Sequence, residues 1–242
     1  MGILEILGPK KTIGAWFQLG SLQIFGLVSD YPFSYLVIDH EHGSRDNIEK
    51  FPIYKKTNQK LLLRTSSRDV TFYSWVLDIG YDGIILANVK SSHDIHNLLS
   101  GTNYGPRGLR GLGYSFANLY SKSISNYDKF TPLIGIQVES VSGLNCFDEI
   151  LNLYSDNIDF AMLGPYDLSL DIGCPGDFSS EKYQLYEKRF LSICGKNSLK
   201  KGIHIVKYSH EGLLKAIDEN YDIYFISTDS RLLVENLNNI FL

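Results

Sequence analysis

Short apolar runs rich in β-branched and aromatic residues recur along the chain and alternate with stretches long enough to form a helix. Several runs are apolar at consecutive positions, which is typical of parallel strands covered on both faces. Ser67 and Ser91 stand where two of the intervening helices would start. The pattern predicts eight strands, over residues 12–20, 34–42, 60–65, 81–89, 131–140, 158–164, 202–207 and 221–228.

Eight strand-then-helix units favour an α/β fold of the (β/α)8 TIM barrel type, with a doubly wound open sheet as the alternative. A chain of 242 residues can bury the core of one such barrel, so we expect a single domain over residues 1–242. The longest connection, residues 101–130, is rich in Gly, Tyr, Ser and Asn. A loop of this length is usually functional or contains short helices of its own.

Composition narrows the choice of partner. A net charge of −4 and a pI near 5.9 provide no broad basic field, which argues against nucleic acid or an anionic membrane and favours small molecules. The three cysteines lack metal-site spacing and suit a reducing compartment. The first residues lack the layout of a signal peptide, and no apolar run reaches the roughly 18 residues that a membrane span needs. We therefore expect a cytoplasmic protein.

Polar side chains stand where the predicted strands end. In a (β/α)8 barrel the active site forms at the carboxyl ends of the strands. Charged groups at the end of an apolar strand must be paired, solvated or bound to a metal, so packing alone does not explain them. The residues concerned are Asp39, Glu41 and His42 after the second strand, Arg64 after the third, Gln137 and Glu139 after the fifth, and Gly164 to Asp167 after the sixth.

Each of these groups has a structural and a catalytic interpretation. Glu139 and Asp167 are either solvated acids or, as carboxylates on neighbouring strands, ligands of a hard divalent cation. Arg64 is either an ion-pair partner of Glu41 or a fixed cation that stabilises an oxyanion. His42 is either an ordinary loop histidine or the general base that chemistry beside a metal needs.

Taken together, a series of motifs resembles the metal-dependent pyruvate aldolases of the HpcH/HpaI type, which include 4-hydroxy-2-oxoheptanedioate and 2-dehydro-3-deoxyglucarate aldolases. The resemblance covers nearly the whole chain and implies a barrel of the phosphoenolpyruvate/pyruvate-binding type. The motifs are, in order, TIGAWFQLGS, YLVIDHEHG, LLLR, VLDIGYDGIIL, YGPRGLRG, IQVE, LGPYDLS, DIGCPG and GIHIV.

The resemblance also implies a metal and substrate site. It assigns Glu139 and Asp167 as ligands of a divalent metal cation, Mg²⁺, Mn²⁺ or Co²⁺, with Gln137 hydrogen-bonded behind the metal. Gly164, Pro165 and Tyr166 would line the metal and receive the substrate carboxylate through backbone N–H groups, although Pro165 has no N–H to give.

The resemblance implies aldol cleavage of a 4-hydroxy-2-oxo acid, a 2-keto-3-deoxy acid for example, to pyruvate and an aldehyde, or the reverse condensation. Arg64 would bind the substrate and stabilise the negative charge on the keto oxygen, while His42, oriented by Asp78, removes the 4-hydroxyl proton. The family also implies a homo-oligomer, a hexamer or trimer, in which the last helix packs on a neighbouring subunit.

The chain departs from the family pattern at three places. Ala87-Asn88-Val89 stands where a proline-containing run is common, and Phe116-Ala117 where an Arg-Ala pair often occurs. Both lie where the aldehyde could bind, so the sequence does not identify the aldehyde. His40 replaces a small or apolar residue, and we interpret it as a packing or hydrogen-bonding residue.

Three other functions remain open. The His40-Glu41-His42 run could bind catalytic zinc in a hydrolase, which would need further ligands such as His204 and Asp229. Lys207 could form a Schiff base with the 2-oxo acid. The chain could also be a non-catalytic family member, although retention of every charged catalytic position argues against this.

Overall fold

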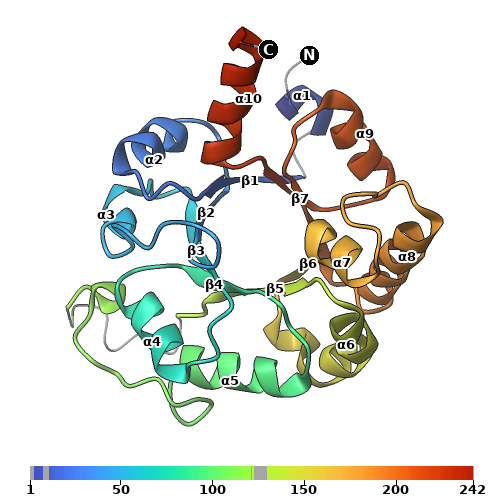
Figure 1. Cartoon of the computed structure of the whole chain (residues 1–242). Helices are drawn as coiled ribbons and strands as arrows, with labels where there is room; N and C mark the ends of the chain where they lie inside the picture. Colours follow the sequence, from blue (N-terminus) through green and yellow to red (C-terminus); the bar gives the residue numbers. More distant parts are fainter. Residues whose placement is uncertain (1–2, 8–10, 121, 123–129, 242) are drawn as a thin grey trace.

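Eight parallel strands close into a barrel surrounded by helices (Figure 1) in the computed structural model, which describes residues 3–7, 11–120, 122 and 130–241. Each strand pairs with the next, and β8 pairs with β1, so the sheet has no free edge. This confirms the predicted (β/α)8 barrel and excludes the open sheet. The strands are β1 Thr12–Phe17, β2 Tyr35–Asp39, β3 Lys60–Thr65, β4 Gly83–Leu86, β5 Leu133–Val138, β6 Phe160–Leu163, β7 Lys200–Ile205 and β8 Ile223–Ile226.

Most strands are shorter than the predicted runs because the polar residues at their carboxyl ends leave the sheet. The run over residues 34–42, for example, forms a strand only to Asp39 and then enters a turn. β7 instead lies two residues earlier than predicted. The residues that leave the sheet form loops at the mouth of the barrel, where side chains are free to face a ligand.

Helices fill the connections. The capping box at Ser91 forms as predicted, with Asp94 as its partner, whereas the helix expected after Ser67 is capped by Asp69. The connection over residues 101–130 contains a short 3₁₀ helix, and its residues 121 and 123–129 lie outside the described residues. The helices are α1 Ile3–Leu7, α2 Leu22–Ser29, α3 Phe51–Tyr54, α4 Val70–Asp78, α5 Ser92–Thr102, η1 Phe116–Asn118, α6 Val141–Tyr154, η3 Ser155–Asn157, α7 Pro165–Asp171, α8 Glu181–Lys196, α9 His210–Asp218 and α10 Asp229–Phe241.

Aromatic side chains form a floor inside the barrel. The rings of Tyr35, Phe160 and Phe225 lie with centroids 6.1–6.3 Å from one another. They fit because two strands have glycine at the facing positions: a Cβ at Gly14 would lie 2.4 Å from the Phe225 ring, and one at Gly135 would lie 2.4 Å from the Phe160 ring. Large rings opposite missing side chains fill the barrel, as close packing requires.

Above this floor the inward positions of the strands become polar. Side chains alternate along a strand, so Val37 in the barrel core is followed on the same face by Asp39, and Leu62 by Arg64. Asp39 and Arg64 are also paired in the register of β2 and β3. The strand alternation therefore brings the charged ends predicted from sequence to one layer at the mouth.

The last helix, α10, projects from the rim of the barrel (Figure 1). Its outer turns expose apolar side chains, including Leu233, Leu237, Ile240 and Phe241. Packing of this helix on a neighbouring subunit stays a prediction. No helix among the described residues has the length and apolar character needed to cross a membrane.

Candidate active site

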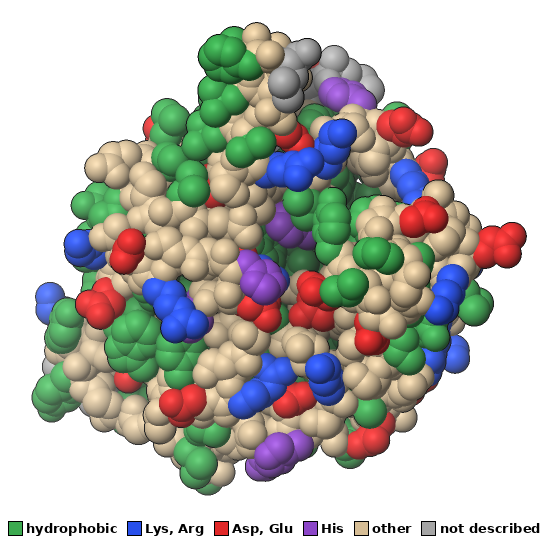
Figure 2. Space-filling view, in the orientation of Figure 1, with side chains coloured by type: hydrophobic (Ala, Val, Ile, Leu, Met, Phe, Trp, Pro, Cys, Tyr) green, Lys and Arg blue, Asp and Glu red, His purple; other side chains and the backbone are tan. Residues whose placement is uncertain are grey.

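A cavity of about 400 Å³ opens at the mouth of the barrel. Figure 2 shows this hollow in the centre of the mouth, with histidine and acidic side chains around it. Most of the predicted site residues line it, whereas Glu139 lies directly behind the lining and Asp78 is absent from it. The lining includes His42, Arg64, Gln137, Gly164, Pro165, Tyr166 and Asp167.

The carboxylate of Asp39 organises the inner wall. It is fully buried and accepts two hydrogen bonds from Arg64, from Nε at 2.9 Å and from Nη2 at 2.6 Å. Its oxygens also accept from Trp16 Nε1 and Gln18 Nε2, on β1 and just beyond it. The same carboxylate accepts from the backbone N–H groups of residues 41 and 42. One side chain thus joins three neighbouring strands to the turn that carries His42.

These contacts keep Asp39 ionised. Burial alone would raise the pKa of Asp39, but the hydrogen bonds and charge of Arg64, together with Gln18 and the backbone of His42, lower it to about 2. Arg64 is itself nearly buried and lies 5.2 Å from the Trp16 ring. Its guanidinium is therefore held in one place at the edge of the cavity.

Arg64 also contacts residues that lie beside the predicted metal ligands. Its Nη1 lies 2.9 Å from Glu41 Oε2, so the ion pair considered from sequence does form. The contact lacks hydrogen-bond geometry, and Glu41 Oε2 is buried without a hydrogen-bond partner. Gln137 accepts from Arg64 at 3.5 Å and donates to Glu139 at 2.6 Å. Gln137 therefore links the arginine to the acidic group, in the position expected behind a metal.

Glu139 is a buried acid with surplus negative charge around it. Its pKa is raised to about 8, by burial first and then by the charges of Glu41 and Asp167, which outweigh the effect of Arg64. Asp167 is exposed in the first turn of α7 and faces the cavity. Three carboxylates thus interact at the mouth. Among the described residues, no cluster of three or more His, Cys, Asp or Glu side chains has the arrangement of a metal site.

The glycine of the GPYD segment leaves room for that acid. A Cβ at Gly164 would lie 2.4 Å from Glu139 Oε2 and 2.8 Å from Gln137 Nε2. The expected donation from its N–H to a substrate is not available, because Gly164 N donates to Val138 O at 3.0 Å. Pro165 has no N–H, so Tyr166, in the first turn of α7, is the member of this trio whose N–H could meet a substrate carboxylate.

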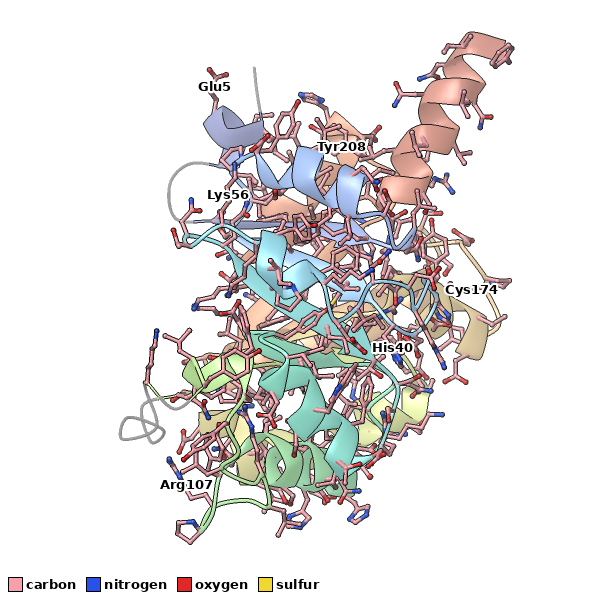
Figure 3. All side chains as sticks on the ribbon, turned by 90° about the vertical axis from the view of Figure 1, so that its left-hand side faces the viewer. Glu5, His40, Lys56, Arg107, Cys174 and Tyr208 are labelled. Atoms are coloured by element: carbon pink, nitrogen blue, oxygen red, sulfur yellow. The ribbon has the colours of Figure 1, made fainter. Side chains whose placement is uncertain are left out.

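The two histidines of IDHEHG have separate surroundings. His42 is exposed and lines the cavity. His40 packs against Phe72 with ring centroids 4.8 Å apart, and its Nδ1 lies 3.2 Å from the hydroxyl of Thr65. This confirms the interpretation of His40 as a packing residue and argues against a zinc-binding pair. In the side view of Figure 3, His40 and Cys174 lie toward the mouth end, whereas Lys56 and Arg107 lie toward the other.

The expected pair of His42 and Asp78 is not formed within the chain. α4 follows β3 and returns toward the start of β4, so its last residue, Asp78, lies at the amino end of the barrel. There its carboxylate accepts hydrogen bonds from buried Arg110 at 2.6 and 3.2 Å. Phe116 packs against Gly80 at the same end, so it too lies away from the mouth. Sequence order alone could not reveal on which face these residues would lie.

The residues that the rival functions require have other contacts. Lys207 lines a second cavity, between β7 and helices α8 and α9, and is not part of the lining that contains Arg64. Asp229 accepts from the backbone N–H groups of Gln18 and Leu19, and so ties β1 to α10. His204 stacks on Trp16 and donates from Nε2 to Ser227 O at 3.0 Å.

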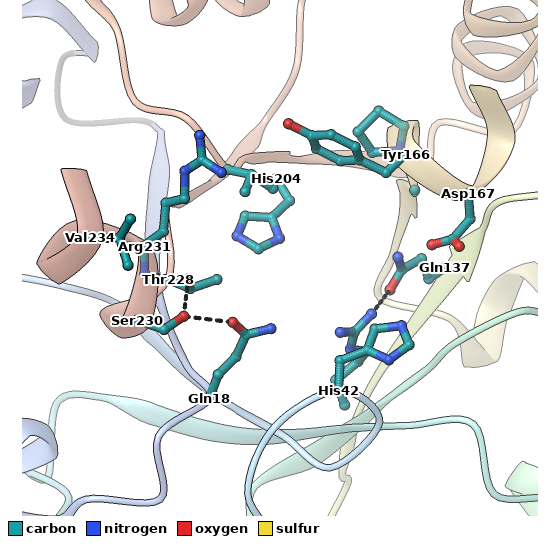
Figure 4. A pocket seen from close by; sticks show the side chains of 14 residues that line it. Gln18, His42, Gln137, Tyr166, Asp167, His204, Thr228, Ser230, Arg231 and Val234 are labelled. Carbon is teal, nitrogen blue, oxygen red and sulfur yellow. Dashed lines mark hydrogen bonds between the residues drawn. The ribbon is translucent and has the colours of Figure 1, made fainter. Parts of the chain in front are cut away.

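Several lining residues were not expected from the sequence. Gln18, Thr228, Ser230 and Arg231 form the wall opposite Asp167 (Figure 4). Ser230 donates to Gln18 at 2.8 Å, and Gln18 in turn donates to the Asp39 carboxylate. The available signal was their place directly after β1 and β8, at the same end of the barrel as the charged residues.

Comparison with known proteins identifies the family of the chain. The family model described as HpcH/HpaI aldolase/citrate lyase matches residues 12–234. The structure of an HpcH/HpaI aldolase from Desulfitobacterium hafniense superposes with a TM-score of 0.83 at 21% identity, covering 96% of this chain and 93% of that one. A family protein from Burkholderia cenocepacia gives a TM-score of 0.86 at 19% identity, over 96% and 93%. These superpositions support the fold.

Sequence relatives carry aldolase names. A hydroxypyruvate/pyruvate aldolase from Agrobacterium fabrum is 26% identical over 182 residues, which are 72% of this chain and 68% of that protein. A 2-keto-3-deoxy-L-rhamnonate aldolase from Klebsiella pneumoniae is 28% identical over 181 residues, which are 71% and 66%. The matched region thus spans about two thirds of each relative's length.

Asp39→Asn should strongly destabilise the protein. The change removes the carboxylate that accepts two hydrogen bonds from buried Arg64 and leaves only the ion pair with Glu41, and breaking a buried ion pair costs about 3–5 kcal/mol of unfolding free energy. Urea denaturation measures the loss. Asp69→Asn is the matched control, because asparagine also caps a helix and this carboxylate is exposed, so a change of at most about 0.5 kcal/mol is expected. Equal effects of the two variants would contradict the central role of Asp39.

Glu139→Gln should change how stability depends on pH. In the presence of chelator, the folded chain keeps a proton on Glu139 up to about pH 8, whereas an ordinary glutamate loses it near 4.5. Wild-type stability should therefore fall as the pH rises through this window, and the variant should gain at least about 1 kcal/mol relative to wild type between pH 5 and 8. Urea denaturation at each pH tests this, and parallel profiles would refute it.

Proposed function

Because the chain belongs to the HpcH/HpaI aldolase/citrate lyase family and is a lyase, we propose that it cleaves a 4-hydroxy-2-oxo acid to pyruvate and an aldehyde, or condenses the two. The relatives named as hydroxypyruvate/pyruvate and 2-keto-3-deoxy acid aldolases support this reaction class. The proposal includes a homo-oligomer, trimer or hexamer, in which α10 packs on a neighbouring subunit through its exposed apolar side chains.

The observation that carries the proposal is the surplus of negative charge at the mouth. The charges of Glu41 and Asp167 both act on Glu139, while Arg64 is held by two hydrogen bonds to Asp39. A protein keeps such a group of acids only where a cation or a proton compensates it. A divalent cation would compensate these acids and would also polarise the oxo group of a 2-oxo acid.

The residues present fit such a cation. Glu139 and Asp167 offer the carboxylate oxygens that Mg²⁺, Mn²⁺ and Co²⁺ accept, and the buried Glu41 Oε2 has no hydrogen-bond partner. We propose Glu139 and Asp167 as the protein ligands, with Gln137 fixing the orientation of Glu139. When bound, the cation supplies Lewis-acid polarisation of the substrate's oxo group.

The chain's own groups carry the remaining steps. Arg64, fixed by Asp39, stabilises the negative charge that grows on the 2-oxo oxygen. The backbone N–H of Tyr166 is placed to meet the substrate carboxylate. His42 takes the proton of the 4-hydroxyl group as the bond between C3 and C4 breaks, and a proton added to C3 completes pyruvate. In the condensation each step runs in reverse.

Schiff-base chemistry is the second candidate function. It would use Lys207, which lies in the second cavity and not beside Arg64. Borohydride treatment with pyruvate separates the two mechanisms, because only a Schiff base is reduced to a covalent adduct. A mass increase at Lys207 would overturn the metal mechanism.

Removing the metal should stop the reaction. Exhaustive chelation should abolish pyruvate release from a panel of 2-keto-3-deoxy acids, and adding Mg²⁺, Mn²⁺ or Co²⁺ should restore it. Asp167→Asn should lower the rate by at least about 10²-fold, because one of two charged ligands is lost. Asp148→Asn, at an exposed position of α6, is the matched control and should keep wild-type activity. Full activity after chelation would refute the proposal.

His42→Ala should stop aldol cleavage while pyruvate still binds, because the groups that hold pyruvate remain. His40→Ala, two residues away in the same turn, controls for damage to the loop and should retain cleavage. A dead His40 variant beside an active His42 variant would reverse the assignment.

A further inference from the structure

The cavity has two chemically different sides. One side carries Asp167 and, behind the lining, Glu139. The other side comes from β1, β8 and the start of α10, and the reaction proposed above leaves it without a role. Figure 4 shows Arg231 on this second side, with Tyr166 and His204 beside the same space. A substrate that fills the cavity must therefore contact both sides.

Arg231 is anchored and still has donors to offer. Its Nε donates to Glu235 Oε1 at 2.9 Å, one turn further along α10. Within the part of the chain that the structure describes, no residue accepts a hydrogen bond from its two terminal nitrogens. The side chain is 42% exposed, so water or a ligand reaches these nitrogens. An exposed ion pair within a helix is weak, which leaves the guanidinium available to a stronger partner.

The hydroxyl of Tyr166 adds a further donor on the side of the cavity that faces Arg231. The residue is 47% exposed, and in Figure 4 its hydroxyl points toward Arg231 across the space above His204. Glu235 and, to a lesser extent, Tyr166 raise the pKa of Arg231, which places the phenol within electrostatic range of the guanidinium. A planar fork of N–H donors beside an O–H donor is a recognition pattern for an oxyanion such as carboxylate or phosphate.

Building on the proposed aldolase function, we propose that Arg231, assisted by the hydroxyl of Tyr166, binds an anionic group at the distal end of the aldehyde. The preferred aldehyde then carries a carboxylate or a phosphate. The 2-oxo acid end lies at Arg64 and the acids, and the anionic tail extends to the opposite side.

Condensation of pyruvate with matched aldehydes tests this assignment. Each anionic aldehyde is compared with a neutral one: succinic semialdehyde with butanal, and glyceraldehyde 3-phosphate with glyceraldehyde. The ratio of kcat/KM values, anionic over neutral, should exceed one in the wild type for at least one pair. The pair with the larger ratio identifies the anion as carboxylate or phosphate.

Arg231→Gln should lower this ratio by about 10- to 100-fold, chiefly through KM, as expected for the loss of a charge-assisted hydrogen bond of about 1.5–3 kcal/mol. Tyr166→Phe should lower it by a smaller factor. Glu235→Gln is the control for the helix, because it removes the ion pair and keeps the arginine, so the ratio should be retained. An equal loss in the Glu235 variant, or a wild type without preference for an anionic aldehyde, would overturn the assignment.

Exchange of the pyruvate methyl protons with D₂O, measured by NMR without aldehyde, separates the two proposals. Wild-type exchange combined with an absent anionic preference overturns only the role of Arg231. Absence of exchange overturns the aldolase function and with it the subsite. The exchange rate is also measured for each variant. A variant that has lost exchange is thereby recognised as misfolded, and a change in its kcat/KM ratio is not attributed to the substituted side chain.

Discussion

The buried ion pair between Asp39 and Arg64 is the contact on which the rest of the site depends. Burying two charges is unfavourable unless their hydrogen-bonding capacity is satisfied, and here Asp39 accepts from the side chains of Trp16, Gln18 and Arg64 and from two backbone N–H groups. The register of β2 and β3 places the two residues opposite each other. A pair of this kind favours one arrangement of the mouth over others, because any shift of a strand would leave a charge without its partner.

The remaining charges follow from that arrangement. Since Arg64 is committed to Asp39, it compensates the nearby acids only in part, and the pKa of Glu139 rises because of burial and of Glu41 and Asp167. Gly164 then allows the Glu139 carboxylate to occupy space that any other residue would fill. The residues at the mouth thus hold one folded arrangement, although the negative charges of the acids there are only partly compensated. This combination is expected where a bound ligand supplies part of the compensating charge.

The fold was largely predictable because its signals are local. Consecutive apolar residues identified all eight strands, and the charged strand ends identified Arg64, Gln137 and Asp167 as lining residues. What the sequence could not provide depends on direction in space. Asp78 ends a helix that runs back to the amino end of the barrel, so it meets Arg110 and not His42. The roles of residues after β8 depend on barrel closure, which brings residues more than 200 positions apart into contact, as Gln18 and Ser230 show.

The aromatic floor of Tyr35, Phe160 and Phe225 has a consequence for the order of events. It fills the barrel below the charged layer, so reactants and products share the mouth as their passage. Along this passage Glu139 is almost completely buried, whereas Arg231 lies half exposed near the rim. If a substrate consists of two parts, a channel that is closed at its inner end requires the part bound at that end to enter first and to leave last. For the proposed aldol reaction, the barrel floor therefore predicts an ordered mechanism in which pyruvate is the first reactant to bind and the last product to leave.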